Sequence, residues 1–278
     1  MLARSGLAAL SDLDSDEWRE VYETLAGEQE AVLRKEGEFR SADYRWPRDA
    51  LRNWSRSWEY PYVYSCLRRW RASWSGTSQP LVLDVGSGVT FFPFAVAKLG
   101  VTVRCLDVDP VCERDLSRAA GVVDCGPGSV SAALSRPHEL PCADQGADAV
   151  YCISVLEHEE EFERLIEEMA RVLRPGGILL LTLDLDVRQE GWALDVPACK
   201  RLRKALAEDF ESLYPEQSVH PVDVLLSNRA PHGFEKLGAA SGMWYFAKQL
   251  VKPLFGRPRR RWPPFHLAVL ALALRSRA

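Results

Sequence analysis

A glycine turn follows a short apolar run in the first half of this 278-residue chain. The run is Leu-Val-Leu-Asp-Val at residues 81–85, and Gly86, Ser87 and Gly88 come directly after it. Glycines between a strand and a helix let the backbone approach a ligand closely because no Cβ intrudes. Such a turn is typical of a nucleotide-cofactor site, with a plain tight turn as the alternative.

An acidic residue ends the next apolar run, where a ribose could be held. Asp107 lies 23 residues after Asp84, and a carboxylate about 20 residues beyond a glycine turn can bind both ribose hydroxyls. Asp109 competes for that role, but it precedes Pro110 at the start of a helical pattern. We therefore predict that Asp109 caps that helix, with Pro110 at its first position.

The spacing of the glycines argues against a dinucleotide cofactor. The dinucleotide fingerprint requires a third glycine at the position of Phe91. A bulky side chain there would crowd a pyrophosphate at the helix start. The turn therefore favours a cofactor without a diphosphate, such as an adenosyl amino acid.

Apolar runs alternate with helical patterns after residue 80, as in parallel β-α units. The runs cover residues 81–85, 101–108, 147–154 and 177–183. They are almost continuously apolar, which predicts strands covered by helices on both faces. A helix is expected over residues 162–173, ended by Pro175, Gly176 and Gly177.

Residues 81–182 resemble class I S-adenosylmethionine-dependent methyltransferases. The segments that carry the resemblance are residues 81–100, 103–110 and 140–182, in that order and at that spacing. The resemblance implies a Rossmann-like, seven-stranded, mostly parallel sheet and S-adenosyl-L-methionine as cofactor. It assigns the amino-acid part of the cofactor to Asp84, Gly86, Ser87 and Gly88, the ribose to Asp107, the adenine to Val108, and the sulfonium pocket to Ser154 and Val155.

This sequence departs from the family pattern at two places. Thr90 stands where family members commonly have a third glycine, and the stretch before residue 145 supplies no clear acid for the adenine amine. Asp124 and Asp144 are the available candidates.

Histidine is the residue type best suited to removing a proton from a methyl acceptor near neutral pH. By the resemblance, His158 lies at the mouth of the cofactor site, in a Leu156–His158 triplet that opens the next helix. The alternative is a helix-start histidine bonded to backbone or solvent. Glu157 is interpreted as a first-turn acid that suits the helix dipole. His232 is a second base candidate, and the histidines have no metal-ligand spacing, so no metal is expected.

The N-terminal 79 residues are rich in aromatic side chains and are predicted to form a helical lid. Helical spacing covers residues 16–35, and a second helix is expected after Pro61. Arg56 or Tyr60 could close over the cofactor carboxylate while tryptophans wall the acceptor. The alternative is an amphipathic helix that packs its aromatics on the sheet edge.

Residues 80–278 are predicted to form the cofactor-binding core. A helix is expected over residues 195–210 with Asp195 as its cap, and a final strand over residues 265–274. Between them, residues 212–262 are interpreted as a cap insertion. It would contain a helix at residues 234–250 and the basic cluster Arg257–Arg261.

Composition narrows the partners and the compartment. A net charge of -4 and a pI near 5.8 argue against nucleic acid as a partner. No signal-peptide pattern opens the chain, and the apolar run at residues 265–274 is too short to cross a bilayer, so a cytoplasmic protein is expected. Seven scattered cysteines without a CxxC pair suggest free thiols.

The combined prediction is a methyltransferase that acts on an oxygen of a small molecule or a sugar-containing metabolite, with His158 as base. The alternatives are transfer to nitrogen or carbon, a non-methylating cyclase or decarboxylase of the same fold, and an RNA methyltransferase. The last rests on the Arg257–Arg261 cluster alone.

Overall fold

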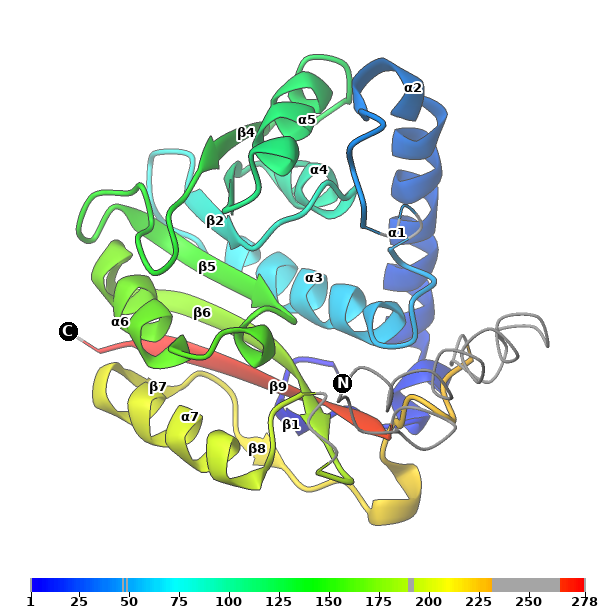
Figure 1. Ribbon diagram of the computed structural model, residues 1–278, viewed down its shortest axis with the longest axis vertical. Helices are drawn as coiled ribbons and strands as arrows, with labels where there is room; N and C mark the ends of the chain where they lie inside the picture. The colour runs from blue at the N-terminus through cyan, green and yellow to red at the C-terminus, as the bar shows by residue number, and fades with distance from the viewer. Residues whose placement is uncertain (1, 47, 49, 190–192, 232–265, 278) are drawn as a thin grey trace, which may run out of the picture.

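The computed structural model describes residues 2–46, 48, 50–189, 193–231 and 266–277. These residues contain a nine-stranded sheet in the order β4-β3-β2-β5-β6-β9-β1-β8, with β7 also paired to β9 (Figure 1). The strands are β1 Ser5–Leu7, β2 Leu81–Val85, β3 Thr102–Asp107, β4 Ser129–Leu134, β5 Ala147–Ile153, β6 Leu173–Asp186, β7 Phe210–Ser212, β8 Glu216–Gln217 and β9 Leu267–Ser276. Strands β2 to β6 pair in parallel, whereas β9 is antiparallel to its neighbours. The predicted α/β fold with a mostly parallel sheet is confirmed.

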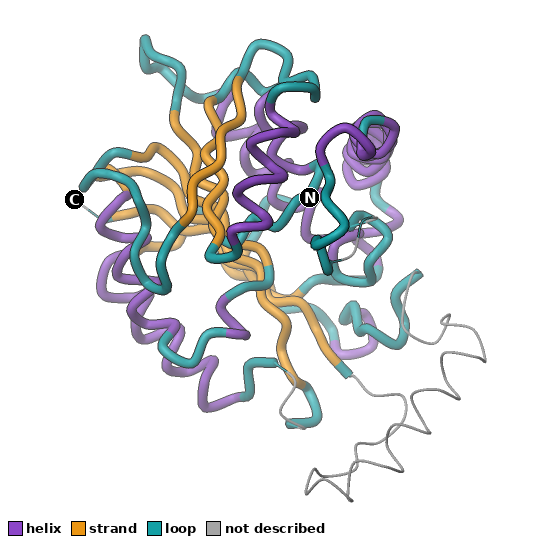
Figure 2. Tube along the Cα trace, turned by 45° about the horizontal axis from the view of Figure 1, so that its top comes forward, coloured by secondary structure: helices purple, strands orange, loops and turns teal. Residues whose placement is uncertain are grey.

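Helices cover both faces of the sheet (Figure 2). They are α1 Asp16–Arg34, α2 Glu36–Phe39, α3 Arg56–Ala72, α4 Phe92–Ala97, α5 Pro110–Ala120, α6 Phe162–Val172 and α7 Val196–Asp209, with 3-10 turns η1 Ser11–Asp14, η2 Leu156–His158 and η3 Pro221–Asp223. Apolar side chains of α1, α3, α4 and α5 form one buried cluster on one face of the sheet. Side chains of α6 and α7 form a second cluster on the other face. Apolar residues alternate between the two clusters along β5 and β6, which explains their nearly continuous apolar sequence.

Four strands lie outside the sequence prediction: β1, β4, β7 and β8. Strand β4 is an edge strand whose outward side chains are exposed, so its sequence has no long apolar run. Strands β1 and β8 are only a few residues long and pair with each other beside β9. The sequence placed β2, β3, β5, β6 and β9, and because β1 lies within the first 79 residues, the N-terminal region is not purely helical.

Helix α1 matches its prediction, whereas α3 does not. Ser15 caps α1 by accepting a hydrogen bond from the Trp18 amide. The expected start of α3 after Pro61 is wrong, because α3 begins at Arg56 and contains Pro61. Proline removes one main-chain donor from a helix interior. The helix continues because the Ser57 carbonyl, four residues before Pro61, accepts a hydrogen bond from Trp18 Nε1 instead.

Cap residues explain where the other helices begin. Asp109 accepts from the Val111 amide at 2.8 Å and caps α5, as predicted. Asp195 accepts from the Ala198 amide at 2.8 Å and caps α7, also as predicted. Helix α6 ends at Val172, and the Pro-Gly-Gly triplet already lies in β6. The Leu156–His158 triplet forms η2, which is separate from α6.

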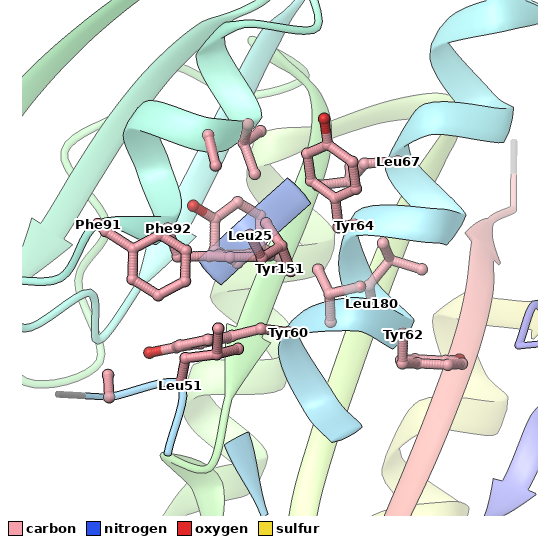
Figure 3. Close-up of a cluster of buried hydrophobic side chains, with 14 of the residues drawn as sticks. Leu25, Leu51, Tyr60, Tyr62, Tyr64, Leu67, Phe91, Phe92, Tyr151 and Leu180 are labelled. Atoms are coloured by element: carbon pink, nitrogen blue, oxygen red, sulfur yellow. The ribbon is translucent and has the colours of Figure 1, made fainter. Parts of the chain in front are cut away.

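Aromatic side chains join α3 to the sheet (Figure 3). Tyr60 stacks on Phe92, with ring centroids 4.5 Å apart, and meets Phe91 edge-on. Phe92 in turn meets Tyr151 of β5 edge-on at 5.5 Å. The aromatic side chains of α3 are mostly buried in the first apolar cluster. This agrees with the alternative that the helix packs its aromatics against the sheet.

Several sequence predictions fall on residues 232–265, outside the described part of the chain. They are His232, the helix at residues 234–250, the Arg257–Arg261 cluster and most of the cap insertion. Among the described helices, none is long and apolar enough to span a membrane. The predicted final strand is confirmed as β9, which pairs with β6 along nine residues from Ile178 to Asp186.

Candidate active site

A cavity of about 370 Å³ opens at the carboxyl ends of β2, β3 and β5. Strand β3 lies on one side of β2 and β5 on the other, and open parallel sheets bind ligands at such a reversal of strand order. The ten residues that the sequence assigned to the cofactor all line this cavity: Arg56, Tyr60, Asp84, Gly86, Ser87, Gly88, Asp107, Val108, Ser154 and Val155. The fold thus brings together residues from four separate stretches of sequence.

The turn after β2 requires its glycines. Gly86 has a φ of 72°, and a Cβ at this position would lie 2.4 Å from Val155 Cγ2. Gly88 has a φ of 53° and donates its amide to Asp107 Oδ2 at 2.9 Å. The turn therefore packs against the loop after β5 and leaves its backbone at the cavity wall.

Asp107 is fixed at the cavity wall by two main-chain amides. Its oxygens accept from the amides of Gly88 and Asp109, each at 2.9 Å. A carboxylate held in this way keeps lone pairs for further donors, such as the hydroxyls of a ribose.

Asp84 is a buried carboxyl group at the same cavity and is only 5% exposed. Burial raises the pKa of Asp84 to about 8, the nearby Asp107 charge adds to the rise, and the Tyr151 hydroxyl opposes it. Asp84 is therefore protonated at neutral pH in the ligand-free protein. A positively charged ligand beside it would favour ionisation.

Helix α3 contributes one cation and one phenol to the cavity. Arg56 donates from Nη1 to Ser154 Oγ at 2.7 Å and forms an ion pair with Glu59. Its hydrogen bonds to Ser55, Glu59 and Ser154 all come from Nη1, and 21% of the side chain is exposed. Burial raises the pKa of Tyr60 to about 12, so this residue stays neutral.

His158 lines the cavity from η2 and is the base candidate that the structure describes. Partial burial and the charge of Arg56 lower the pKa of His158, against a weaker opposing effect of Glu159. The imidazole is therefore neutral at pH 7 and can accept a proton.

Glu157 does not act as a simple first-turn acid. Its Oε1 accepts the Asp184 amide at 3.1 Å and so ties η2 to the end of β6. Burial raises the pKa of Glu157 to about 7, and the charge of Glu59 contributes to the rise. Glu157 lies in the first turn of η2, as predicted, but η2 ends at His158 and the Glu157 carboxyl also faces another carboxyl group.

Sequence reasoning missed the segment between α2 and α3. Tyr44, Trp46 and Asn53 line the cavity from this segment. The Tyr44 hydroxyl accepts the Val89 amide at 3.1 Å, which anchors the segment to the glycine turn. Trp46 is 62% exposed although it lines the cavity. The aromatic density of the region was the available signal, but it did not single out these positions.

The adenine candidates from the sequence lie elsewhere. Asp124 pairs with Lys98 at 3.3 Å, and Asp144 pairs with Arg171 at 2.6 Å. Neither residue lines the cavity, whereas the loop after β4 does, through Ser135, Arg136, Pro137, His138 and Leu140. The described residues contain no group of histidine, cysteine and acidic side chains that could hold a metal ion.

These residues fit S-adenosylmethionine in charge and shape. The cavity has the size of a small-molecule site, and the glycine backbone leaves room for a close ligand. A cationic ligand would lower the raised pKa of Asp84 and favour its ionised form. A protein-family model described as a methyltransferase domain matches residues 83–181 of this chain. The chain carries a class I S-adenosylmethionine-dependent methyltransferase domain.

Two curated relatives share this domain. "Methyltransferase GfsG" of Streptomyces halstedii is 33% identical over 146 residues, which are 51% of this chain and 48% of the relative. "Ubiquinone biosynthesis O-methyltransferase" of Xanthomonas oryzae pv. oryzae (strain PXO99A) is 32% identical over 102 residues, 36% of this chain and 41% of the relative. The matched part therefore spans about half or less of each relative.

A solved structure extends the fold similarity beyond the methyltransferase domain. The [4+2]-cyclase SpnF aligns with a TM-score of 0.50 and 17% identity, over 99% of this chain and 99% of the cyclase chain. At that identity the likeness concerns the fold alone. Because a cyclase shares this fold, the fold by itself identifies neither the reaction nor the substrate.

Proposed function

We propose that this methyltransferase moves a methyl group from S-adenosylmethionine to an oxygen of a small molecule or a sugar-containing metabolite. The observation that carries the proposal is the single cavity in which the glycine turn, Asp107 and Asp84 meet a neutral His158. The cofactor, when bound, supplies an electrophilic methyl group. The protein must then align the acceptor and receive its proton.

Each wall of the cavity has one role in this proposal. Asp107 holds the ribose diol, and the turn at Gly86–Gly88 holds the amino-acid part together with Asp84. Arg56 meets the cofactor carboxylate through its remaining donors, with Tyr60 beside it. Val108 flanks the adenine, and Ser154 and Val155 lie beside the sulfonium. All of these groups line the cavity.

The acceptor oxygen is inferred from His158. A hydroxyl must lose its proton as it gains a methyl group, and a neutral imidazole at the cavity can take that proton. The Xanthomonas relative is named as an O-methyltransferase, which agrees with this choice. Exposed Trp46 at the cavity offers apolar area to an organic acceptor. The seven free cysteines fit a cytoplasmic, reducing compartment.

The direct test is transfer of label from methyl-tritiated cofactor to a panel of hydroxylated small molecules. The proposal expects labelled product, and it expects Asp107→Ala to weaken cofactor binding by about 1.5–3 kcal/mol in calorimetry. Asp144→Ala, which removes an exposed carboxylate outside the cavity, is the matched control and should bind as the wild type does.

The other outcomes separate the rival functions. Cofactor binding without label in any hydroxyl, amine or carbon acceptor would favour a non-methylating enzyme of this fold. Label in an amine or at carbon would correct the acceptor atom and leave the transferase assignment in place. Label in RNA, with steep salt dependence, would favour the nucleic-acid alternative.

A further inference from the structure

Three carboxyl groups gather around one guanidinium behind the wall of the cavity. Glu59 of α3 is 0% exposed and pairs with Arg56 of the same helix. Glu157 of η2 and Asp184 of β6 face this pair, and burial raises the pKa values of both, with the charge of Glu59 adding to the rise. The titratable groups around the cluster also include Tyr60 on α3 and His158 on η2.

Arg56 and Ser154 connect this cluster to the cavity. Ser154 lines the cavity, and its Oγ donates to Glu59 Oε1 at 2.8 Å. Arg56 donates to the same Ser154 Oγ at 2.7 Å. Ser154 has a φ of 49°, a conformation uncommon for a residue other than glycine. The two contacts from α3 therefore fix Ser154 where the negative cluster reaches the cavity.

The cluster has more negative groups than positive ones. Arg56 is its only cation among the described residues. Glu157 Oε2 and Asp184 Oδ1 are buried and have no hydrogen-bond partner among the described residues. Even with one proton shared by Glu157 and Asp184, the four groups keep a net negative charge. Buried charges of one sign are costly unless a positive charge compensates them.

The methyl-transfer reaction changes the charge of the ligand beside Ser154. The sulfonium of the cofactor is positive, whereas the thioether of S-adenosylhomocysteine is neutral; the carboxylate and ammonium are the same in both. We propose that the Glu59, Glu157 and Asp184 cluster makes the cavity prefer the sulfonium cofactor over the neutral product. This inference rests on the proposed function, which puts the sulfonium beside Ser154.

The test measures the affinities of three ligands by calorimetry at about pH 8, where Glu157 is mostly ionised. The ligands are S-adenosylmethionine, S-adenosylhomocysteine, and sinefungin, which has an amine-bearing carbon in place of the methylated sulfur. One variant is Glu59→Gln, and the other combines Glu157→Gln with Asp184→Asn, because the charge of this pair is lost only when both carboxyls are replaced. In each, the preference for the two cationic ligands over S-adenosylhomocysteine should fall roughly fivefold, from the loss of one nearby charge. All three substitutions keep the shape of the side chain.

Asp148→Asn is the matched control. Asp148 is also a buried carboxylate on β5, but it lies at the opposite end of the strand and binds the Leu81 amide and Arg174. Its substitution should leave the ratio of affinities unchanged. Thermal unfolding of each variant shows whether it folds, and Glu59→Gln provides the second measurement if the double variant does not fold.

Equal weakening of all three ligands would overturn the inference, because a purely structural role moves every affinity together. An unchanged ratio in both folded variants would also overturn it while leaving the proposed function intact. Failure of the wild-type protein to bind any of the three ligands would instead refute the cofactor assignment itself.

Discussion

The indole Nε1 of Trp18 donates a hydrogen bond at 2.9 Å to the main-chain oxygen of Ser57, four residues before Pro61. Pro61 has no amide hydrogen, so this oxygen has lost its usual donor within α3. Helix α1 supplies the missing donor and thereby joins the first helix to the helix that carries Arg56 and Tyr60.

Trp18→Phe should destabilise the protein because it leaves the Ser57 carbonyl without its donor. The expected loss is about 1–3 kcal/mol in free energy of unfolding, measured in urea. Trp74→Phe is the control, since Trp74 Nε1 reaches only the exposed Ser78 carbonyl at 3.3 Å. Equal losses in the two variants would mean that the Trp18 contact has no special role.

Gly86→Ala should disable the cofactor site. The new Cβ would lie 2.4 Å from Val155 Cγ2, and the φ of 72° adds strain for any side chain. A displacement of the turn by about 1 Å should lower turnover roughly 100-fold. Gly176→Ala meets the same backbone strain, with a φ of 77° but no atom within 4 Å of its Cβ, and should keep turnover. A fully active Gly86→Ala enzyme would contradict the assignment of this turn.

Asp84 should make the ligand-free protein less stable as pH rises. Its pKa is about 8 in the folded protein against an ordinary value of 3.8, so the folded state holds a proton that the unfolded state has released. The stabilisation is complete below about pH 4 and is lost as pH rises through about 8. Between about pH 6 and pH 8 the wild type should lose on the order of 2 kcal/mol more than Asp84→Asn. Parallel stability curves would rule out this role of Asp84.

His158 should set the acidic limb of the pH profile. Its pKa lies below the ordinary 6.5, so kcat/KM should be constant near pH 7 and fall only below about pH 6.5. His158→Gln should lower kcat about 100-fold or more and abolish that limb. Cofactor affinity is the control and should change little. A limb that persists in the variant would assign the proton to another group.

The sequence alone determined the central strands of the α/β core. The almost continuous apolar runs predicted β2, β3, β5 and β6, because strands covered on both faces leave little room for polar residues. Local cap chemistry predicted the starts of α5 and α7. The glycine turn was identifiable because a close-packed backbone turn restricts residue type within a few positions. Asp107 was identifiable because it ends the next apolar run, at the spacing typical of a ribose-binding acid.

Only the tertiary structure decided which distant residues complete the site. The start of α3 could not be predicted from Pro61, since the donor that satisfies the Ser57 carbonyl comes from Trp18, 39 residues away. The burial of Glu157 beside Asp184 and Glu59 arises where η2, β6 and α3 meet. No local pattern encodes such a meeting, because a carboxyl group has the same sequence signature in solvent as in a buried cluster. The charge around the proposed sulfonium position is therefore a property of the fold.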